Sequence, residues 1–414
     1  MKILFLSLIA IYVVLRGVMQ YFSYTGKTTP EKEKLALKYF SREEIDKGAE
    51  YMRRGFGIGV LQKAVDFLFP FVFFFTGISL ALSGALKLPA FFGSETLRVV
   101  FFVIIYFLAS FSLNLPFKFY FGFVLEHKFG FSNMTKKEWF FFNIKQLSVS
   151  LVFTAILAAA SYFVFRRFGF STWIWLIPVV MLVFDLFLTF IYPYLILPLF
   201  YKKSNFEDEK YAKPIREVAE KSGVHIKKIY MINESKYSKH TNAFFTGFGP
   251  EKSIYIFDTL VKSNTPEQVA SVVAHEVGHW KHHHVLKNIA LGFAGSFLMT
   301  ALIYLTYDCG IVDTNAVSIS DVAGLPFILI ILTVYSYFLA PIENIISRKF
   351  EVTADTYEIN MGGHPEVYIK SMVQLSKDNK SFLYPHPLVV FWFASHPPIL
   401  ERVKMGEDFN KNKS

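Results

Sequence analysis

The chain is short of cysteine and of charged residues. It has 414 residues and one cysteine, so an intramolecular disulfide and a zinc site built from thiolates are both excluded. Charged residues make up 18% of the chain, against about 25% in soluble domains, while 53% are hydrophobic and 48 are phenylalanine. No basic stripe with interleaved aromatic residues is present, which argues against nucleic-acid binding. There is also no internal repeat. This composition is typical of a membrane protein.

Seven apolar stretches are long enough to cross a hydrocarbon core of about 30 Å as helices. We expect these spans at 2–23, 60–84, 97–120, 146–166, 172–200, 285–307 and 322–344. The Ala- and Gly-rich fourth and sixth stretches could alternatively be buried helices of a soluble domain. No small-x-small cleavage site follows the first stretch, so we expect a retained span and not a signal peptide. The expected fold class is mainly α, a polytopic membrane protein with about seven transmembrane helices.

Basic residues are distributed unevenly among the loops. Eight Lys or Arg lie in 27–54 and four in 128–145, whereas 309–320 contains none. By the positive-inside rule, the N-terminus faces outward, and loops one, three and five and the C-terminus face the cytosol. The net charge of +10 then serves membrane orientation and contact with anionic lipid. We expect an integral multi-pass protein of a bacterial plasma membrane or of the endoplasmic reticulum membrane.

An H-E-x-x-H pentad stands at His275, Glu276 and His279. Thr265 as N-cap and Pro266 at the first position predict a helix leading into it. Two histidines four residues apart share one helical face, so both can reach one tetrahedral Zn²⁺. The glutamate between them cannot easily bind the same ion, but it can take a proton from water that the metal activates.

A third ligand is expected from 343–355. Glu351 and Asp355 are four residues apart and share a face if this segment is helical. Taken alone, they also suit an exposed acidic pair. Beside the pentad, we interpret Glu351 as the carboxylate of a His₂Glu site with one zinc per chain and an open fourth position. Asp355 would then hold the ring N–H of a ligand histidine.

The longest segment outside the membrane is 201–282, and it predicts a small α+β domain. An amphipathic helix is expected over 209–222, followed by strands at 228–232, 243–245 and 253–257. A substrate peptide can add in extended form to an edge strand beside a metal. A hairpin strand with its aromatic side chains facing the core is an equally good interpretation of 243–245.

Several stretches, in the right order, resemble the type I CAAX prenyl proteases, which are integral-membrane zinc metalloendopeptidases. The similarity covers about 60–405 and rests on 123–132, 192–200, 242–248, 275–280, 343–355 and 395–398. It implies seven helices that enclose a chamber, with a zinc-peptidase domain of the gluzincin type. The expected parts are a five-span bundle (1–200), a cytosol-facing peptidase domain (201–284), spans six and seven (285–346) and a C-terminal part completing the zinc site (347–414).

The resemblance also implies roles for residues that the sequence alone would leave unassigned. His396 would stabilise the oxyanion, although by itself it is a turn histidine. Arg402 would lie near the C-terminal carboxylate of the substrate, although by itself it is an exposed helix arginine. Asn344 would brace the site. The expected substrate-binding strand consists of Asn242, Ala243, Phe244 and Phe245. The histidines at 282–284 are interpreted as interfacial groups or as supports of the ligands.

These features predict a membrane-embedded zinc metalloendopeptidase. Its substrate would be a peptide or protein, and the family removes the C-terminal tripeptide of prenylated CAAX proteins or trims related substrates. One alternative is a quality-control protease resembling the heat-shock membrane metalloproteases. Another is a metal-handling transporter that binds ions at 279–284. Ion pathways place their ligands inside spans, whereas Glu276 and Glu351 fall at or beyond the predicted span ends.

Overall fold

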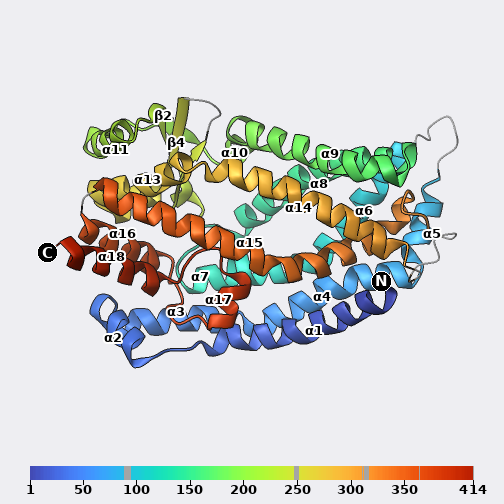
Figure 1. Cartoon of the computed structure of the whole chain (residues 1–414), viewed down its shortest axis with the longest axis horizontal. Helices are drawn as coiled ribbons and strands as arrows, with labels where there is room; N and C mark the ends of the chain where they lie inside the picture. The colour runs from blue at the N-terminus through green and yellow to red at the C-terminus, as the bar shows by residue number, and fades with distance from the viewer. Residues whose placement is uncertain (88–94, 247–250, 310, 312–316, 363, 414) are drawn as a thin grey trace.

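The computed structural model describes residues 1–414 apart from 88–94, 247–250, 310, 312–316, 363 and 414. Long helices run along the longest axis, with the sheet and the C-terminus at one end and the N-terminus at the other (Figure 1). Seven helical segments in the described residues are long and apolar enough to cross a membrane, which confirms a mainly α, polytopic architecture. They are Lys2–Thr25, Arg42–Phe75, Glu95–Lys128, Lys136–Arg167, Phe170–Phe200, His284–Tyr307 and Val322–Met361.

The second span differs from its expected range of 60–84. It is built from α3 (Arg42–Arg54) and α4 (Phe56–Phe75), and it ends before Gly77. Gly77 has φ +82°, a left-handed conformation that glycine adopts at little cost and that ends the helix. The chain then begins a separate helix, α5 (Ile78–Ala85). The apolar run is therefore one stretch in sequence but two helices in the structure.

The other spans match the expected segments and extend past several of them. They are α1 (Lys2–Thr25), α6 (Glu95–Phe119), α8 (Lys136–Arg167), α9 (Phe170–Ile191), α14 (His284–Tyr307) and α15 (Leu325–Gly362). Helix α8 starts at a capping box in which Thr135 and Glu138 satisfy each other's backbone N–H groups. Helix α15 has 38 residues and continues beyond the expected end of span seven. The expected boundary between 346 and 347 thus lies inside one continuous helix.

A four-stranded sheet covers the end of the bundle. Its strands are β1 (Lys203–Asn205), β2 (His225–Ile232), β3 (Ala243–Thr246) and β4 (Glu251–Phe257), in the order β1-β2-β4-β3. The β2–β4 pair is parallel and the other two pairs are antiparallel, so β3 lies at an edge. Strand β1 was not predicted, because its three residues are polar and exposed.

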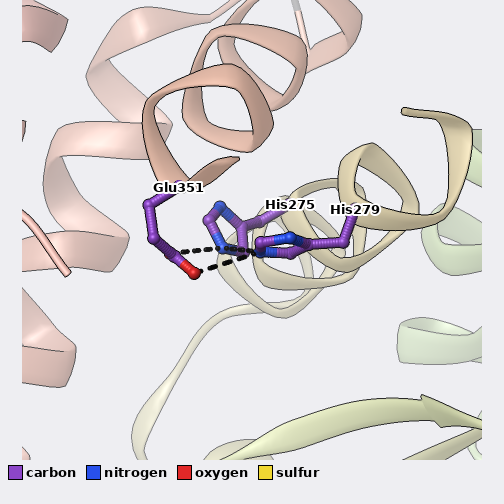
Figure 2. Close-up of side chains that lie close together, drawn as sticks. All are labelled: His275, His279 and Glu351. Atoms are coloured by element: carbon purple, nitrogen blue, oxygen red, sulfur yellow. Dashed lines mark hydrogen bonds and ion pairs between the residues drawn. The ribbon is translucent and has the colours of Figure 1, made fainter. Parts of the chain in front are cut away.

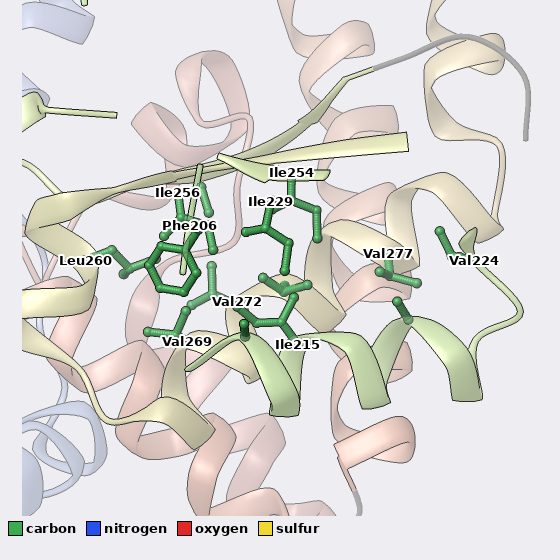
Figure 3. Packing of buried hydrophobic residues seen from close by; sticks show 14 residues of the cluster. Phe206, Ile215, Val224, Ile229, Ile254, Ile256, Leu260, Val269, Val272 and Val277 are labelled. Atoms are coloured by element: carbon green, nitrogen blue, oxygen red, sulfur yellow. The ribbon is translucent and has the colours of Figure 1, made fainter. Parts of the chain in front are cut away.

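One face of the sheet is covered by α11 (Glu209–Lys221) and α13 (Pro266–Lys281), as Figure 3 shows. Alternate strand residues such as Ile254 and Ile256 point into this layer, where both are fully buried. Val269, Val273 and Val277 follow helical spacing on α13 and belong to the same hydrophobic cluster. This packing fixes the helix that carries the pentad relative to the sheet.

Distant parts of the chain meet beside this domain. Helices α2 (Pro30–Tyr39) and α3 share a hydrophobic core with α16 (Pro365–Asp378) and α18 (Ile399–Lys413). Ion pairs such as Lys404–Glu31 and Lys38–Glu407 join the same helices at the surface. The remaining elements are η1 (Tyr120–Leu125), α7 (Glu126–Lys128), η2 (Tyr192–Ile196), α10 (Leu197–Phe200), η3 (Glu234–Lys236), α12 (Asp258–Ser263), η4 (Val322–Gly324) and α17 (Pro387–Phe393).

A cavity of about 890 Å³ lies between the spans. Side chains from α6, α8, α9, α14 and α15 line it, and most of them are apolar. Its polar lining residues include Glu343, Asn344, Ser347 and Ser395. Ser347 is one helical turn before Glu351, and Ser395 precedes His396. The cavity therefore adjoins the residues predicted to form the metal site.

Candidate metal centre

Two helices, α13 and α15, bring the predicted ligands together. Thr265 caps α13 and accepts a hydrogen bond from the Gln268 backbone, and Pro266 occupies the first turn. The two helices approach closely at Gly278, where an added Cβ would lie 3.0 Å from the Ala354 Cα. His275, His279 and Glu351 point toward one another across this contact (Figure 2).

The spacing of the three side chains fits one tetrahedral metal ion. The two histidine Nε2 atoms are 3.1 Å apart, and the Glu351 oxygens lie 3.3 Å from His275 Nε2 and 3.4 Å from His279 Nε2. Ligand atoms about 2.0–2.1 Å from a tetrahedral Zn²⁺ are separated by about 3.3 Å. Glu351 Oε2 is buried, and no described residue donates a hydrogen bond to it. A buried carboxylate oxygen without a donor is expected where a cation binds.

Asp355 and Arg402 lie directly behind His275. Asp355 Oδ1 is 2.9 Å from His275 Nδ1, and the Arg402 Nε donates to Asp355 Oδ2 at 2.9 Å. A second guanidinium nitrogen of Arg402 donates to the other carboxylate oxygen. The resemblance implied that Arg402 would face a substrate carboxylate. The structure instead places the fork of its guanidinium on Asp355, with 13% of the side chain exposed.

The protonation of His275 follows from this setting. Burial lowers the pKa of His275, but the neighbouring Asp355 and Glu351 carboxylates raise it by more, to about 10. Without a metal, a proton on this ring would therefore neutralise the buried carboxylates. A metal cation can take over that charge, which is further evidence that the donor set fits one.

Glu276 follows His275 on α13 and is partly exposed. Desolvation raises the pKa of its carboxyl group above the ordinary glutamate value. A carboxylate with a raised pKa is a better proton acceptor, which suits a general base. Glu276 thus lies outside the group of three converging ligands, and its carboxyl group is desolvated.

His396 also approaches the centre, from the turn before α18. Its Nε2 is 3.3 Å from Glu351 Oε1, and its Nδ1 is 2.8 Å from the Ser395 hydroxyl. Arg348 holds this turn by donating to the carbonyl of Val390 at 2.9 Å and to that of Ala394. Asn344 donates to the Trp392 carbonyl at 2.6 Å. Asn344 and Arg348 therefore fix the approach of the segment that carries His396.

The predicted substrate strand corresponds to β3, which packs against α13. Ala243 is buried and Phe244 stacks on Tyr255 with a centroid distance of 5.2 Å. Asn242 is exposed just before the strand, and its side-chain oxygen accepts from the Ala243 backbone N–H. One edge of β3 pairs with β4, and the sheet order leaves the other edge free among the described residues.

One buried group at the centre, Glu358, was not identified from the sequence. Glu358 is 1% exposed, contacts the Ser271 hydroxyl, and lies 3.7 Å from His275 Nδ1. Its spacing of three residues after Asp355 on α15 is the signal that could have identified it. His284, one of the histidines that the sequence suggested as interfacial groups or as supports of the ligands, lies against His279.

A polytopic helical protein with an H-E-x-x-H helix and a glutamate from a second helix is an integral-membrane metallopeptidase. Residues 205–407 match Peptidase family M48, and 20–202 match the CAAX prenyl protease N-terminal region with its five membrane helices. The chain belongs to peptidase family M48, and within it to the CAAX prenyl protease 1 type. This confirms the resemblance, and with it a metal-dependent hydrolase that acts on peptide or protein substrates.

Individual relatives agree with this assignment. CAAX prenyl protease 1 of Saccharomyces cerevisiae is 30% identical over 309 residues, covering 70% of this chain and 68% of the relative. The uncharacterized metalloprotease YhfN of Bacillus subtilis is 26% identical, covering 85% and 82%. The crystal structure of S. mikatae Ste24p superposes with a TM-score of 0.83 at 26% identity, covering 96% of this chain and 97% of that one.

Proposed function

We propose that this chain is a zinc endopeptidase that removes the C-terminal tripeptide of prenylated CAAX proteins, or trims related lipid-bearing substrates, at the cytosolic face of the membrane. The observation that carries the proposal is the large apolar cavity adjoining the metal centre. Removing the last three residues of a CAAX terminus cleaves the bond next to the lipid-bearing cysteine. A lipid-binding space must therefore lie close to the metal.

His275, His279 and Glu351 would hold the zinc ion. When bound, zinc polarises the scissile carbonyl and lowers the pKa of water to about 7. Glu276 takes the proton from the attacking water and delivers it to the leaving amine. His396, whose Nδ1 contacts the Ser395 hydroxyl, donates from Nε2 to the oxygen on which negative charge develops. Asp355 orients His275, and Arg402 holds Asp355.

Strand β3 would bind the peptide part of the substrate. An extended segment pairs with its free edge through backbone hydrogen bonds, which accept many side chains. Asn242, Ala243, Phe244 and Phe245 border this edge. Arg402 is already paired with Asp355, so we do not assign it to the substrate.

The chemistry of the cavity favours a lipid over a peptide as its occupant. A peptide placed among apolar walls leaves its backbone N–H and C=O groups without partners, at several kcal/mol for each group. A hydrocarbon chain incurs no such cost and gains about 0.8 kcal/mol for each buried CH₂. The cytosolic orientation is supported by the basic segment 27–54, whose helices pack against α16 and α18, the helix that carries Arg402.

Quality control of membrane proteins is the second candidate. It is favoured by the similarity to a metalloprotease of a bacterium, Bacillus subtilis YhfN, because protein prenylation is not expected in bacteria. A quality-control protease would cleave unlipidated and lipidated chains alike.

The test compares the wild type with Glu276→Gln in detergent. A matched control, Glu267→Gln, changes an exposed glutamate on the same helix. Zinc content is measured, and cleavage is followed on a farnesylated CAAX peptide and on the same peptide without its lipid. We expect one zinc per chain in all three proteins, cleavage lost only in Glu276→Gln, and preference for the farnesylated peptide. Equal cleavage of both peptides favours quality control, and wild type without zinc contradicts both candidates.

A further inference from the structure

A third histidine, His284, contacts the ligand His279 from the side away from the metal centre. The two Nδ1 atoms are 2.9 Å apart, at hydrogen-bond distance. His284 is 3% exposed and stacks on the Phe350 ring, with centroids 4.2 Å apart and planes 10° apart. Burial and stacking therefore hold its ring in one orientation. Phe350 directly precedes Glu351, so this packing also reaches the third ligand.

The contact determines where the protons of both rings lie. The Nε2 of His279 faces His275 and Glu351, so Nε2 is the atom available to the metal. A neutral ring that binds metal through Nε2 carries its proton on Nδ1. Because the two Nδ1 atoms face each other, His279 must donate and His284 must accept. His284 then carries its own proton on Nε2.

We infer that His284 is a positioning residue of the metal centre, whose Nδ1 accepts the hydrogen bond that fixes the tautomer and ring orientation of His279. The inference rests on the proposed function in taking zinc as the metal. Ligand histidines usually donate their second N–H to a carboxylate, a carbonyl or water. His275 has Asp355 for this task, whereas His279 has a neutral imidazole. The two ligands thus have supports of different charge.

His284 also joins the metal centre to the membrane. It is the first residue of α14, and the preceding His283 has φ +56°, so the chain turns sharply between α13 and span six. The support of His279 is therefore supplied by the end of a transmembrane helix. A ligand in the peptidase domain is oriented by the bundle beneath it.

The test replaces the acceptor while keeping the packing. His284→Phe retains a ring to stack on Phe350 but cannot accept, whereas His284→Asn places an amide oxygen close to where Nδ1 lay. His282→Phe is the matched control, because the His282 ring lies beside His284 and Tyr357, each at a centroid distance of 5.8 Å, and a phenyl ring keeps both contacts. The zinc dissociation constant is measured on the metal-free, full-length protein in detergent by competition with a chelating dye. The optical spectrum with Co²⁺ reports the coordination number.

We expect His284→Phe to weaken zinc binding about 10- to 100-fold, and His284→Asn and His282→Phe to stay near wild type. Equal affinity of His284→Phe and wild type would overturn the inference, as would an Asn variant as weak as the Phe variant. Should the Phe variant lose its helical circular dichroism, His284→Ala replaces it in the same comparison. Wild type that binds no zinc would refute the proposed function, an outcome distinct from zinc binding that is insensitive to residue 284.

Discussion

At the scale of single residues, acidic and basic side chains alternate from the metal position toward the protein interior. Glu351 faces the metal position, His275 lies between it and Asp355, and Arg402 closes the series behind Asp355. Each buried carboxylate therefore has a cationic or proton-bearing partner, which keeps the cost of burial low. Removing one member leaves its neighbour buried with an uncompensated charge.

The first prediction concerns the proton on His275. Because the pKa of this ring is about 10 without metal, zinc must displace a proton at neutral pH. We expect the zinc association constant to rise about tenfold per pH unit between pH 7 and 9 and to level off above the pKa. Chelator competition at several pH values measures it. An affinity that does not change across this range would show that His275 is already neutral.

The second prediction concerns the buried ion pair. Arg402→Gln leaves Asp355, which is 0% exposed, without its cation, and we expect a loss of about 3–5 kcal/mol of unfolding free energy. Arg216→Gln is the control, because Arg216 forms a similar two-bond pair with Glu209 in solvent, with side chains 47% and 68% exposed. That change should cost less than about 1 kcal/mol. Thermal unfolding of both variants measures the two losses of stability. Equal decreases in the unfolding temperature would contradict the prediction.

At the scale of elements, the site depends on how closely α13 and α15 approach. Gly278 lies between the two ligand histidines on α13, facing Ala354 on α15. The backbone of Ala354 cannot move aside as a flexible side chain can, so the distance between the helices is set by the missing Cβ. Ligand spacing is thus a property of the helix pair and not only of the three ligands.

The third prediction follows from this contact. In Gly278→Ala, the new methyl group would lie 3.0 Å from the Ala354 Cα, so the helices must separate by a few tenths of an ångström. We expect weaker zinc binding even though every ligand is present, because a shift of this size disturbs tetrahedral geometry. Gly57→Ala on α4, where no atom lies within 4 Å, is the control. Unchanged zinc affinity in Gly278→Ala would mean that the helix contact is not limiting.

Local patterns predicted most elements, and the misses have physical causes. The His-x-x-x-His and Glu-x-x-x-Asp spacings predicted which faces of α13 and α15 carry the site, because helical geometry alone determines them. The break at Gly77 was missed because apolarity continues across it, and only the backbone changes. The resemblance assigned Arg402 to the substrate, and its pairing with Asp355, 47 residues away in sequence, is a contact that no local pattern reveals. The His279–His284 contact depends on the turn at His283, which no periodicity reveals.

At the scale of the whole molecule, the spans enclose an apolar space beside a hydrolytic site. Gly292 and Gly295 on α14 line this space, and an added Cβ at either would meet no atom within 4 Å. These glycines keep the cavity wide along one helix face. The bundle therefore provides room next to the metal that the peptidase domain alone does not have.

The fourth prediction uses this width. Gly295→Leu adds a side chain that projects into the cavity, so we expect it to slow cleavage of a farnesylated peptide. The unlipidated peptide should be affected less, because its chain binds at β3 and not in the cavity. Cleavage rates of both peptides are measured for the wild type and the variant, and the ratio of the farnesylated to the unlipidated rate is compared between the two proteins. A ratio that stays constant would show that the lipid binds elsewhere.

The fifth prediction concerns orientation in the membrane. Cys309 follows α14, which begins at the metal centre, so the only cysteine of the chain lies at the opposite end of the bundle. If the metal centre faces the cytosol, an impermeant maleimide added to right-side-out vesicles should label Cys309, which is partly exposed, without permeabilisation. In a Cys309→Ser background, Ser204→Cys on exposed β1 should be labelled only after permeabilisation. The reverse pattern would place the peptidase domain outside, and the basic segment 27–54 would then break the positive-inside rule. Because each protein carries a single thiol and the two thiols lie at opposite ends of the same fold, the pair distinguishes inverted insertion from a failure of labelling.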